Sequence, residues 1–449
     1  MSPDTVAAAS SERPGLLDRL LAPFAEVKAG EAATALLLML NVFLLLAAYY
    51  VIKTVREPLI LAGGGAEVKS YTAGGQAALL LFLVPAYGAF ASRVNRARLI
   101  TWVTLFFALN LVIFYVLALA KTPYLGVAFF LWVGIFNLMI IAQFWGFAND
   151  VYTAEQGKRL FAIVGVGASL GAIFGAWLAK EIIAVVGVYP PMLIAAGILI
   201  ACIVLTRLAD ARERGRSAAR AVAPVSDVPI SGRGGFSLVF SERYLMLIAV
   251  LMVVLNFVNT NGEYILSKSV TQVVHQMAAS GRTGGMDVDA WTKQQIGLFY
   301  ASYLWWVSLL GAVIQMFVVS RVMKWIGVRG ALFALPFIAL GGYGILAAVP
   351  VLSAIKVAKI FENATDYSLQ NTSRQALFLP TSREAKYKAK AAIDSFFVRG
   401  GDLLSTGLVF AGTKLALTPQ KFAAVNVVLV AVWIGIVILI GREHRRLSQ

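Results

Sequence analysis

Long stretches of apolar residues follow one another along the whole chain, and no other feature limits its possible folds so strongly. An α-helix needs about 20 such residues to cross the hydrocarbon core of a bilayer, where it must satisfy its backbone hydrogen bonds internally. Of the 449 residues, 59% are hydrophobic and only 14% are charged, which is far outside the range of soluble globular proteins. The sequence therefore predicts an all-α polytopic membrane protein. Twelve spans are expected, at residues 32–61, 72–92, 98–120, 123–150, 159–186, 190–208, 244–268, 294–319, 328–349, 350–374, 390–415 and 420–441.

A polar segment, residues 209–242, separates the sixth and seventh expected spans. It is rich in Arg, Ala, Ser and Gly and has no apolar stretch long enough to cross a membrane, so it predicts a cytoplasmic linker. The linker divides the chain into an N-terminal six-helix half, residues 1–208, and a C-terminal six-helix half, residues 243–449. Two such halves around a central cavity form the major-facilitator arrangement, whose substrate site lies near the midplane between the repeats.

The net charge of +16 is concentrated on alternate connections between spans and at the two ends of the chain. This distribution follows the positive-inside pattern and predicts that both termini are cytoplasmic. The basic clusters are therefore interpreted as topology signals beside the lipid bilayer, and no nucleic-acid partner is expected. The chain has one cysteine and two histidines, so we expect no disulfide, metal site or cofactor. No cleaved signal is expected before Ala32.

Charged and polar residues lie on single faces of several expected spans, where they are costly and usually functional. In the first span, Lys53, Arg56 and Glu57 share one side of the helix. In the seventh span, Asn259 and Glu263 are one helical turn apart on an otherwise apolar helix. These two faces predict polar walls of a cavity.

The tenth and eleventh spans carry more charge than the others. Lys356, Lys359, Asn363, Asp366 and Gln370 repeat at spacings of three and four residues, which places them on one face of the tenth span. The eleventh span carries two close pairs of opposite charge, which are Lys390 with Asp394 and Arg399 with Asp402. A hydrated cavity for a charged substrate explains the row in the tenth span, whereas the two pairs in the eleventh also fit internal ion pairs that act as gates.

Two further patterns have alternative interpretations. The glycines at 165, 167, 171 and 175 are spaced like a phosphate-binding loop, but they lie inside an apolar span and favour a close contact between helices. Tyr300, Tyr303, Trp305 and Trp306 could stack on a nucleobase, but aromatic belts at membrane interfaces are commoner, and we favour a belt.

Several motifs resemble those of the non-mitochondrial ATP/ADP translocase family, which comprises nucleotide transporters of plastids and bacteria with a major-facilitator-like fold. Glu263 fits a family carboxylate in the seventh span, with Asn259 and Lys268 near it. The other matching stretches are KTVREPLIL (53–61), GAEV (65–68), FWGFAN (144–149), EQGKRLF (155–161), FLP (378–380) and AKAAIDS (389–395). The family's glutamate in the fourth span has no counterpart, because no carboxylate occurs between Lys121 and Asn149.

The resemblance implies exchange of ATP and ADP across a bacterial inner membrane, without enzymatic chemistry. It places Arg56 and Lys390 in one cavity from opposite halves, as phosphate ligands, with Glu263 balancing the empty site. The expected substrate-binding residues are Lys53, Arg56, Asn259, Glu263, Lys356, Lys359, Asp366 and Lys390, and the expected gating residues are Glu57, Asp394, Arg399 and Asp402.

Two alternatives stay open. The same fold could carry another anionic or polar solute with protons, with Glu57, Glu263, Glu362 or Asp366 as the titrating group. A membrane scaffold that transports nothing would explain the spans but not their charged faces. The oligomeric state cannot be inferred from the sequence.

Overall fold

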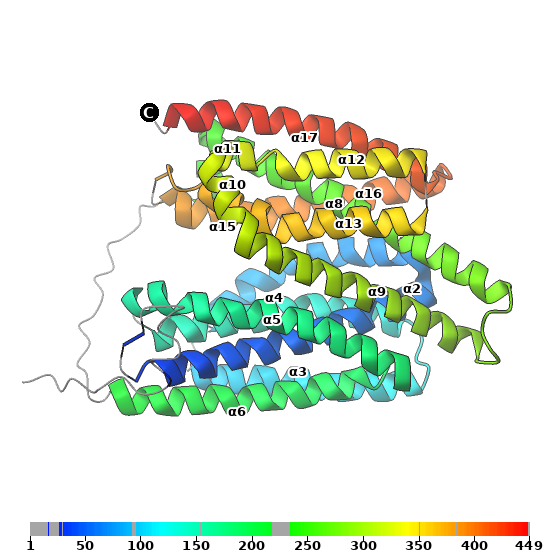
Figure 1. Ribbon diagram of the computed structural model, residues 1–449, viewed down its shortest axis with the longest axis horizontal. Coiled ribbons are helices and arrows are strands. Elements are labelled where there is room, and N and C mark those ends of the chain that lie inside the picture. Colours follow the sequence, from blue (N-terminus) through cyan, green and yellow to red (C-terminus); the bar gives the residue numbers. More distant parts are fainter. Residues whose placement is uncertain are drawn as a thin grey trace, which may run out of the picture.

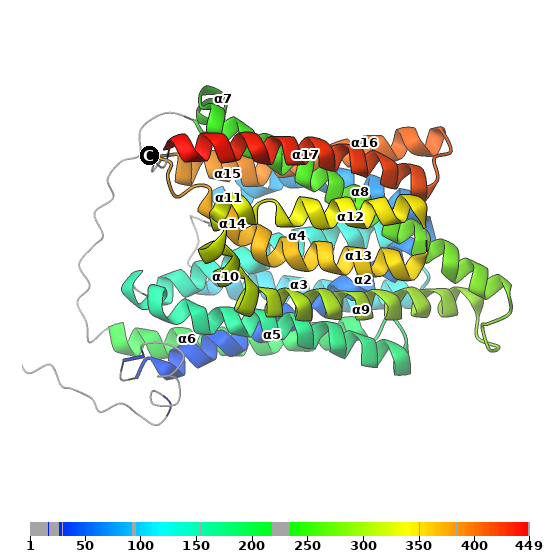
Figure 2. The ribbon, with the colours of Figure 1, turned by 45° about the horizontal axis from the view of Figure 1, so that its top comes forward.

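The fold was taken from a computed structural model, which describes residues 17, 27–28, 30–91, 96–152, 154–217, 234–349, 351–382 and 384–447. Within these residues every regular element is helical, and the long helices run roughly parallel in two groups (Figure 1). The predicted all-α class is therefore confirmed. Helix α9 lies at the boundary between the two groups in both ribbon views, beside α5 (Figure 2).

The first group contains the helices of the N-terminal half. Its helices are α2 (Ala32–Ala91), α3 (Arg96–Leu119), α4 (Leu125–Val151), α5 (Ala154–Val186) and α6 (Pro191–Ser217). Helix α2 covers the first two expected spans and turns back at Gly65, where φ is 73° and ψ is −176°. Only glycine adopts this backbone conformation readily, so Gly65 allows one helical stretch to cross the structure twice.

The second group contains the helices of the C-terminal half, several of which are interrupted by π-helical turns. Its principal elements are α7 (Gly235–Ser241), α8 (Arg243–Ala279), α9 (Val288–Val313), η1 (Ile314–Val318), α10 (Val319–Trp325), α11 (Gly327–Ala331), α12 (Ala334–Ala348), α13 (Leu352–Thr365), η2 (Asp366–Gln370), α14 (Asn371–Ala376), η3 (Ala385–Ala389), α15 (Lys390–Ala392), η4 (Ile393–Phe397), α16 (Val398–Lys414) and α17 (Pro419–Leu447). The π-helical turns η2 and η4 lie in the charged tenth and eleventh spans, and η3 directly precedes the eleventh. Such turns are frequent at functional sites.

Nine helical stretches of the described chain are long and apolar enough to cross a membrane. The bent stretch in α2 counts as one of them, and the charged stretches around α13 and α16 are helical but are not among the nine. The count of twelve crossings therefore stays a prediction. The expected linker begins with a continuation of α6 as far as Ser217 and ends with the short helix α7, whereas residues 218–233 lie outside the described residues.

Three of the four glycines of the fifth span form the predicted close helix contact, whereas Gly165 faces open space. A Cβ atom added at Gly167, Gly171 or Gly175 would lie 2.4, 2.2 and 2.4 Å from backbone carbonyl oxygens of α2, so only glycine fits at these positions. Two large clusters of buried apolar side chains flank this region, one centred in each half. The cluster centred in the C-terminal half also includes Ile60, Phe130 and Ala176 of the other half, so apolar packing joins the two halves.

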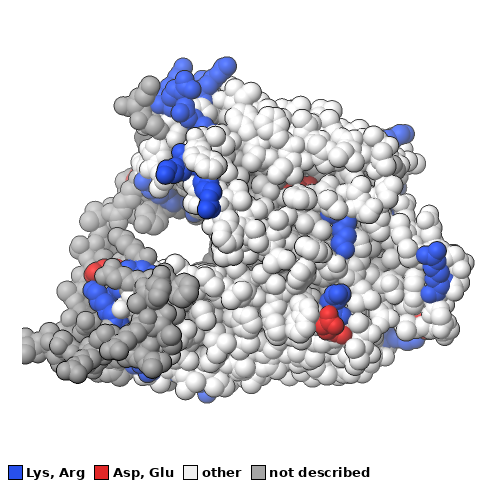
Figure 3. Space-filling model, in the orientation of Figure 1, with Lys and Arg blue, Asp and Glu red and all other residues white. Residues whose placement is uncertain are grey.

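The two ends of the molecule differ. Figure 3 shows a hollow between the halves at the end where the C-terminus lies. At the opposite end, side chains of α2 contact α8: Tyr264 Oη and Lys268 Nζ donate to Glu67 Oε1 at 3.0 and 2.5 Å. Thr406 Oγ1 of α16 also donates to the backbone oxygen of Ser70 at 3.1 Å. The halves are therefore apart at one end and joined at the other.

Candidate functional site

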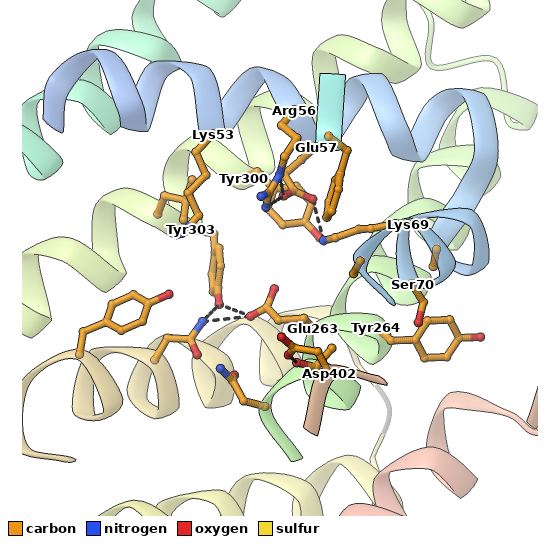
Figure 4. Close-up of a pocket in the computed structure, with 18 of the residues that line it drawn as sticks. Lys53, Arg56, Glu57, Lys69, Ser70, Glu263, Tyr264, Tyr300, Tyr303 and Asp402 are labelled. Carbon is orange, nitrogen blue, oxygen red and sulfur yellow. Dashed lines mark hydrogen bonds and ion pairs between the residues drawn. The ribbon is translucent and has the colours of Figure 1, made fainter. Parts of the chain in front are cut away.

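A cavity of about 310 Å³ lies between the two halves. This volume falls at the lower end of the range of small-molecule sites, about 300–1,000 Å³. Figure 4 shows that its labelled charged side chains come from α2 on one side and from α8 and α16 on the other. The lining residues on which the description depends are Tyr49, Lys53, Arg56, Glu57, Lys69, Phe130, Asn259, Thr260, Glu263, Tyr264, Tyr300, Tyr303, Asn363, Tyr367, Arg399 and Asp402.

The described lining carries an excess of positive charge. Four side chains are cationic and three are anionic, which leaves one positive charge (4 − 3 = 1). Charges inside a membrane protein normally face such a cavity and mark a substrate pathway. The cavity can therefore hold an anionic group without any change in the protein's own ionisation.

Lys53 is the cavity cation with the fewest polar contacts. Its Nζ lies 5.5 Å from the centre of the Tyr50 ring and 5.9 Å from that of Tyr367, which belong to opposite halves. Within the described part of the chain it makes no ion pair. An ammonium placed between two aromatic faces in a polar cavity is available to bind an incoming anion.

Arg56, Glu57 and Lys69 form a buried charge cluster on the α2 side of the cavity. The Arg56 guanidinium donates to Glu57 from Nε at 3.0 Å and makes a second contact from Nη2. Lys69 Nζ forms an ion pair with the other carboxylate oxygen of Glu57 at 2.6 Å. The guanidinium also packs on the Phe130 ring, with 4.5 Å between Cζ and the ring centre. The single carboxylate thus holds two cations.

Glu263 lies on the opposite wall and belongs to a second polar network. Its Oε1 accepts hydrogen bonds from Tyr303 Oη at 3.1 Å and Asn363 Nδ2 at 3.0 Å. Lys359 Nζ is 3.6 Å from the same oxygen and 3.2 Å from Glu362, so two carboxylates share one lysine. This network fixes Glu263 on the C-terminal half, away from the Arg56 cluster.

Arg399 and Asp402 form an ion pair that also lines the cavity. Their side chains are 3.2 Å apart, and Asp402 Oδ1 accepts a hydrogen bond from Thr260 Oγ1 at 2.7 Å. This pair therefore joins α16 to α8 inside the C-terminal half. The arrangement is compatible with the expected gating role, which stays a prediction.

The prediction that the four aromatic residues at 300, 303, 305 and 306 form a belt at the membrane interface is wrong for Tyr300 and Tyr303. Tyr300 and Tyr303 are each 2% exposed and line the cavity, whereas Trp306 is 48% exposed. The two tyrosines follow a helical spacing of three, which brings both to the inner side of α9. They supply hydroxyl groups and ring faces to the site.

Several expected ligands do not line this cavity. Lys359 is 1% exposed and lies behind Glu263, where it also donates to Asn259 Oδ1 at 2.9 Å. Lys356 donates to Ser302 Oγ at 3.0 Å, and Asp366 belongs to η2. The structure does not bring Arg56 and Lys390 together, since Lys390 is paired with Asp394 at 3.7 Å and neither residue of that pair is part of the lining.

Lys69 is not among the residues predicted to bind substrate, because it lies between the first two expected spans, 32–61 and 72–92. The sequence feature that could have predicted its position is the run of three glycines at 63–65, which favours a turn in the helix. Because Gly65 turns the helix, Lys69 returns to the level of Glu57 inside the structure. Its Nζ also donates to Ser267 Oγ of α8 at 2.8 Å.

Comparisons with known proteins agree with this architecture. A model of the Major Facilitator Superfamily matches residues 32–361, and a model of the TLC ATP/ADP transporter family matches residues 293–444. An ADP,ATP carrier protein 1 of Chlamydia muridarum is 24% identical over 66% of this chain and 61% of its own length. The corresponding protein of Rickettsia bellii is 23% identical over 69% and 66%. The matched region thus spans less than two thirds of the chlamydial relative.

Solved structures are similar over nearly the whole chain. A bacterial homologue of the iron transporter ferroportin, in an inward-facing state, has a TM-score of 0.62 at 12% identity, covering 91% of this chain and 98% of its own. A mutant of the nucleoside transporter NupG has a TM-score of 0.57 at 12% identity, with 93% and 100% covered. At this identity the likeness shows the fold alone.

Proposed function

This chain belongs to the Major Facilitator Superfamily, and we propose that it exchanges nucleotides of the ATP and ADP type across a membrane by alternating access. The observation that carries the proposal is the cavity between the halves, with its excess cation and with Lys53 and Arg56 on its wall. The similarity to ADP,ATP carrier proteins supports a nucleotide as the anion. In this proposal the membrane is a bacterial inner membrane and both termini are cytoplasmic.

The positions of the side chains suggest how a nucleotide would be held. Phosphate oxygens would contact Lys53 as a point charge and Arg56 as a planar fork, two geometries that suit phosphate recognition. Asn259 and Glu263 on the opposite wall would contact the polar edge of the ligand. Lys356, Lys359, Asp366 and Lys390 would not contact the ligand, because they lie outside the lining.

The cavity would open to the cytoplasm in the conformation described here. Rocking of the halves would close the hollow seen in Figure 3 and break the contacts of α2 with α8 at the other end. Such motion around a fixed central site is the usual basis of alternating access. The ion pairs of Lys390 with Asp394, and of Arg399 with Asp402, would rearrange as the halves move.

Binding to the purified protein tests the proposed substrate. We expect ADP and ATP to raise its melting temperature in detergent in a saturable way, and adenosine at the same concentration to have a much smaller effect, because the cavity selects for negative charge. Equal effects of all three compounds, or no effect of any, would contradict the proposal.

Proton-coupled transport of an anion is a second candidate, and the pairing of Lys359 with two carboxylates favours it. One lysine balances only one of Glu263 and Glu362, so the pair could carry a proton through the cycle. An imposed pH gradient would then drive net uptake of the anionic substrate into liposomes that contain no substrate at the start. Under nucleotide exchange, the same gradient would drive none.

A further inference from the structure

The Glu57 carboxylate occupies a position that an anionic group of a substrate could also occupy. It is 3% exposed at its side chain, and its two oxygens contact the guanidinium of Arg56 and the ammonium of Lys69 (Figure 4). All three side chains line the cavity. Proteins also bind phosphate oxygens with the planar guanidinium of an arginine and the ammonium of a lysine, the two groups that contact Glu57 here.

The fold brings these two cations together from separate segments of α2. Arg56 precedes the turn at Gly65, and Lys69 follows it. The side chains of Arg56 and Lys69 are only 16% and 10% exposed, so neither cation is well hydrated. Two poorly hydrated cations need an anion beside them, and within the described cluster Glu57 supplies it.

We propose that Arg56 and Lys69 form an anion subsite that Glu57 fills in the empty protein, and that a phosphate or comparable group of the substrate binds by taking the place of the Glu57 carboxylate. This inference rests on the proposed function and identifies the groups that compete within the same cavity. It assigns binding to Lys69 and an inhibitory role to Glu57. The substrate's affinity is therefore set partly by an internal competitor.

The subsite is connected to the joined end of the molecule through Lys69. Its Nζ donates to Ser267 Oγ at 2.8 Å, and Ser267 belongs to α8 in the opposite half. The next residue, Lys268, is paired with Glu67 at 2.5 Å. An anion that draws Lys69 toward the cavity would weaken its bond to Ser267, so occupancy of the subsite would loosen the contact between the halves.

Calorimetric titration of the full chain in detergent tests the subsite with ADP, inorganic pyrophosphate and adenosine. For Glu57→Gln we expect ADP and pyrophosphate to bind about tenfold more tightly than to the wild type, with adenosine changing less than about twofold. Glutamine keeps the shape of the side chain but removes the competing charge. The gain should disappear in the Glu57→Gln, Lys69→Met double variant. Asp289→Asn, which removes a carboxylate paired with Lys293 outside this cavity, should change none of the affinities.

Each outcome decides the inference. No gain in Glu57→Gln, or a gain of equal size for adenosine, would overturn it even if ADP binds the wild type and the proposed function stands. If pyrophosphate shows the gain while ADP binds neither protein, the subsite stands and the nucleotide assignment fails. If Glu57→Gln does not fold, Glu57→Asp replaces it, since its shorter carboxylate should compete less and give a smaller gain. Absence of any gain there would also overturn the inference.

Discussion

Replacement of Lys53 by methionine isolates the contribution of one cation to substrate binding. Methionine keeps an unbranched apolar stem and removes the charge. Lys53 lies between the Tyr50 and Tyr367 rings and makes no ion pair within the described residues, so its removal leaves no buried carboxylate unbalanced. Removal of Arg56 would be harder to interpret, because it would leave Glu57 with one cation in place of two.

The expected loss follows from the kind of contact removed. A hydrogen bond to a charged group contributes about 1.5–3 kcal/mol, and each 1.4 kcal/mol corresponds to a tenfold change in affinity. Lys53→Met should therefore weaken ADP binding about 10- to 100-fold and change adenosine binding by less than about threefold. Competition between unlabelled ligands and radiolabelled ADP on purified protein measures both.

Lys356→Met serves as the matched control. Lys356 is also a membrane lysine beside an aromatic ring, 5.0 Å from the centre of Phe299, but it bonds to Ser302 and is not part of the cavity lining. It should change neither affinity by more than about threefold. If Lys53→Met weakens ADP and adenosine equally, or leaves ADP binding unchanged, Lys53 does not bind the phosphates.

Three further substitutions test other parts of the structure. Glu263→Gln should slow exchange about tenfold while the protein stays folded, because it weakens charge-assisted hydrogen bonds worth about 1.4 kcal/mol; normal exchange at every pH would exclude both an ion-pair role and a proton-coupling role. Burial opposes the charge of Glu31, but hydrogen bonds from Arg159 and neighbouring donors outweigh it and hold the pKa of Glu31 below its ordinary value. The ionised Glu31 carboxylate therefore stabilises the fold fully above the unfolded pKa of about 4.3, and this stabilisation is lost as the pH falls through the lowered folded pKa. Glu31→Gln should lower the free energy of unfolding by about 2 kcal/mol at pH 7 and by progressively less in acid, as measured by thermal unfolding. Gly171→Leu should destabilise the protein by at least about 1–3 kcal/mol, because its Cβ would lie 2.2 Å from a carbonyl oxygen of α2, whereas Gly165→Leu meets open space and should cost much less; equal melting temperatures would refute the close packing of α5 on α2.

Helical periodicity was enough to predict much of the cavity wall. Lys53, Arg56 and Glu57 line the cavity from one helix, and Asn259 and Glu263 line it from another. Their spacings place them on one face, and the cost of charge in hydrocarbon turns that face away from lipid. These residues could be found because both rules act within a single helix.

The remaining contacts depend on how helices are placed against one another. Lys359 shares a face with Lys356, yet it is buried between Glu263 and Glu362 rather than open to the cavity. Lys69 reaches Glu57 only because the chain turns at Gly65. Neither the depth of a side chain within a bundle nor the direction of a helix after a turn is encoded by periodicity.

Exchange in liposomes tests the central claim most directly. Purified protein is reconstituted into liposomes that contain ADP, and uptake of radiolabelled ATP from outside is followed with no pH gradient. We predict rapid uptake that requires internal ADP, is absent when the liposomes contain adenosine instead, and is reduced in Lys53→Met. Uptake that is equally fast into liposomes without internal nucleotide, or no ATP uptake at all, would contradict nucleotide exchange by this protein.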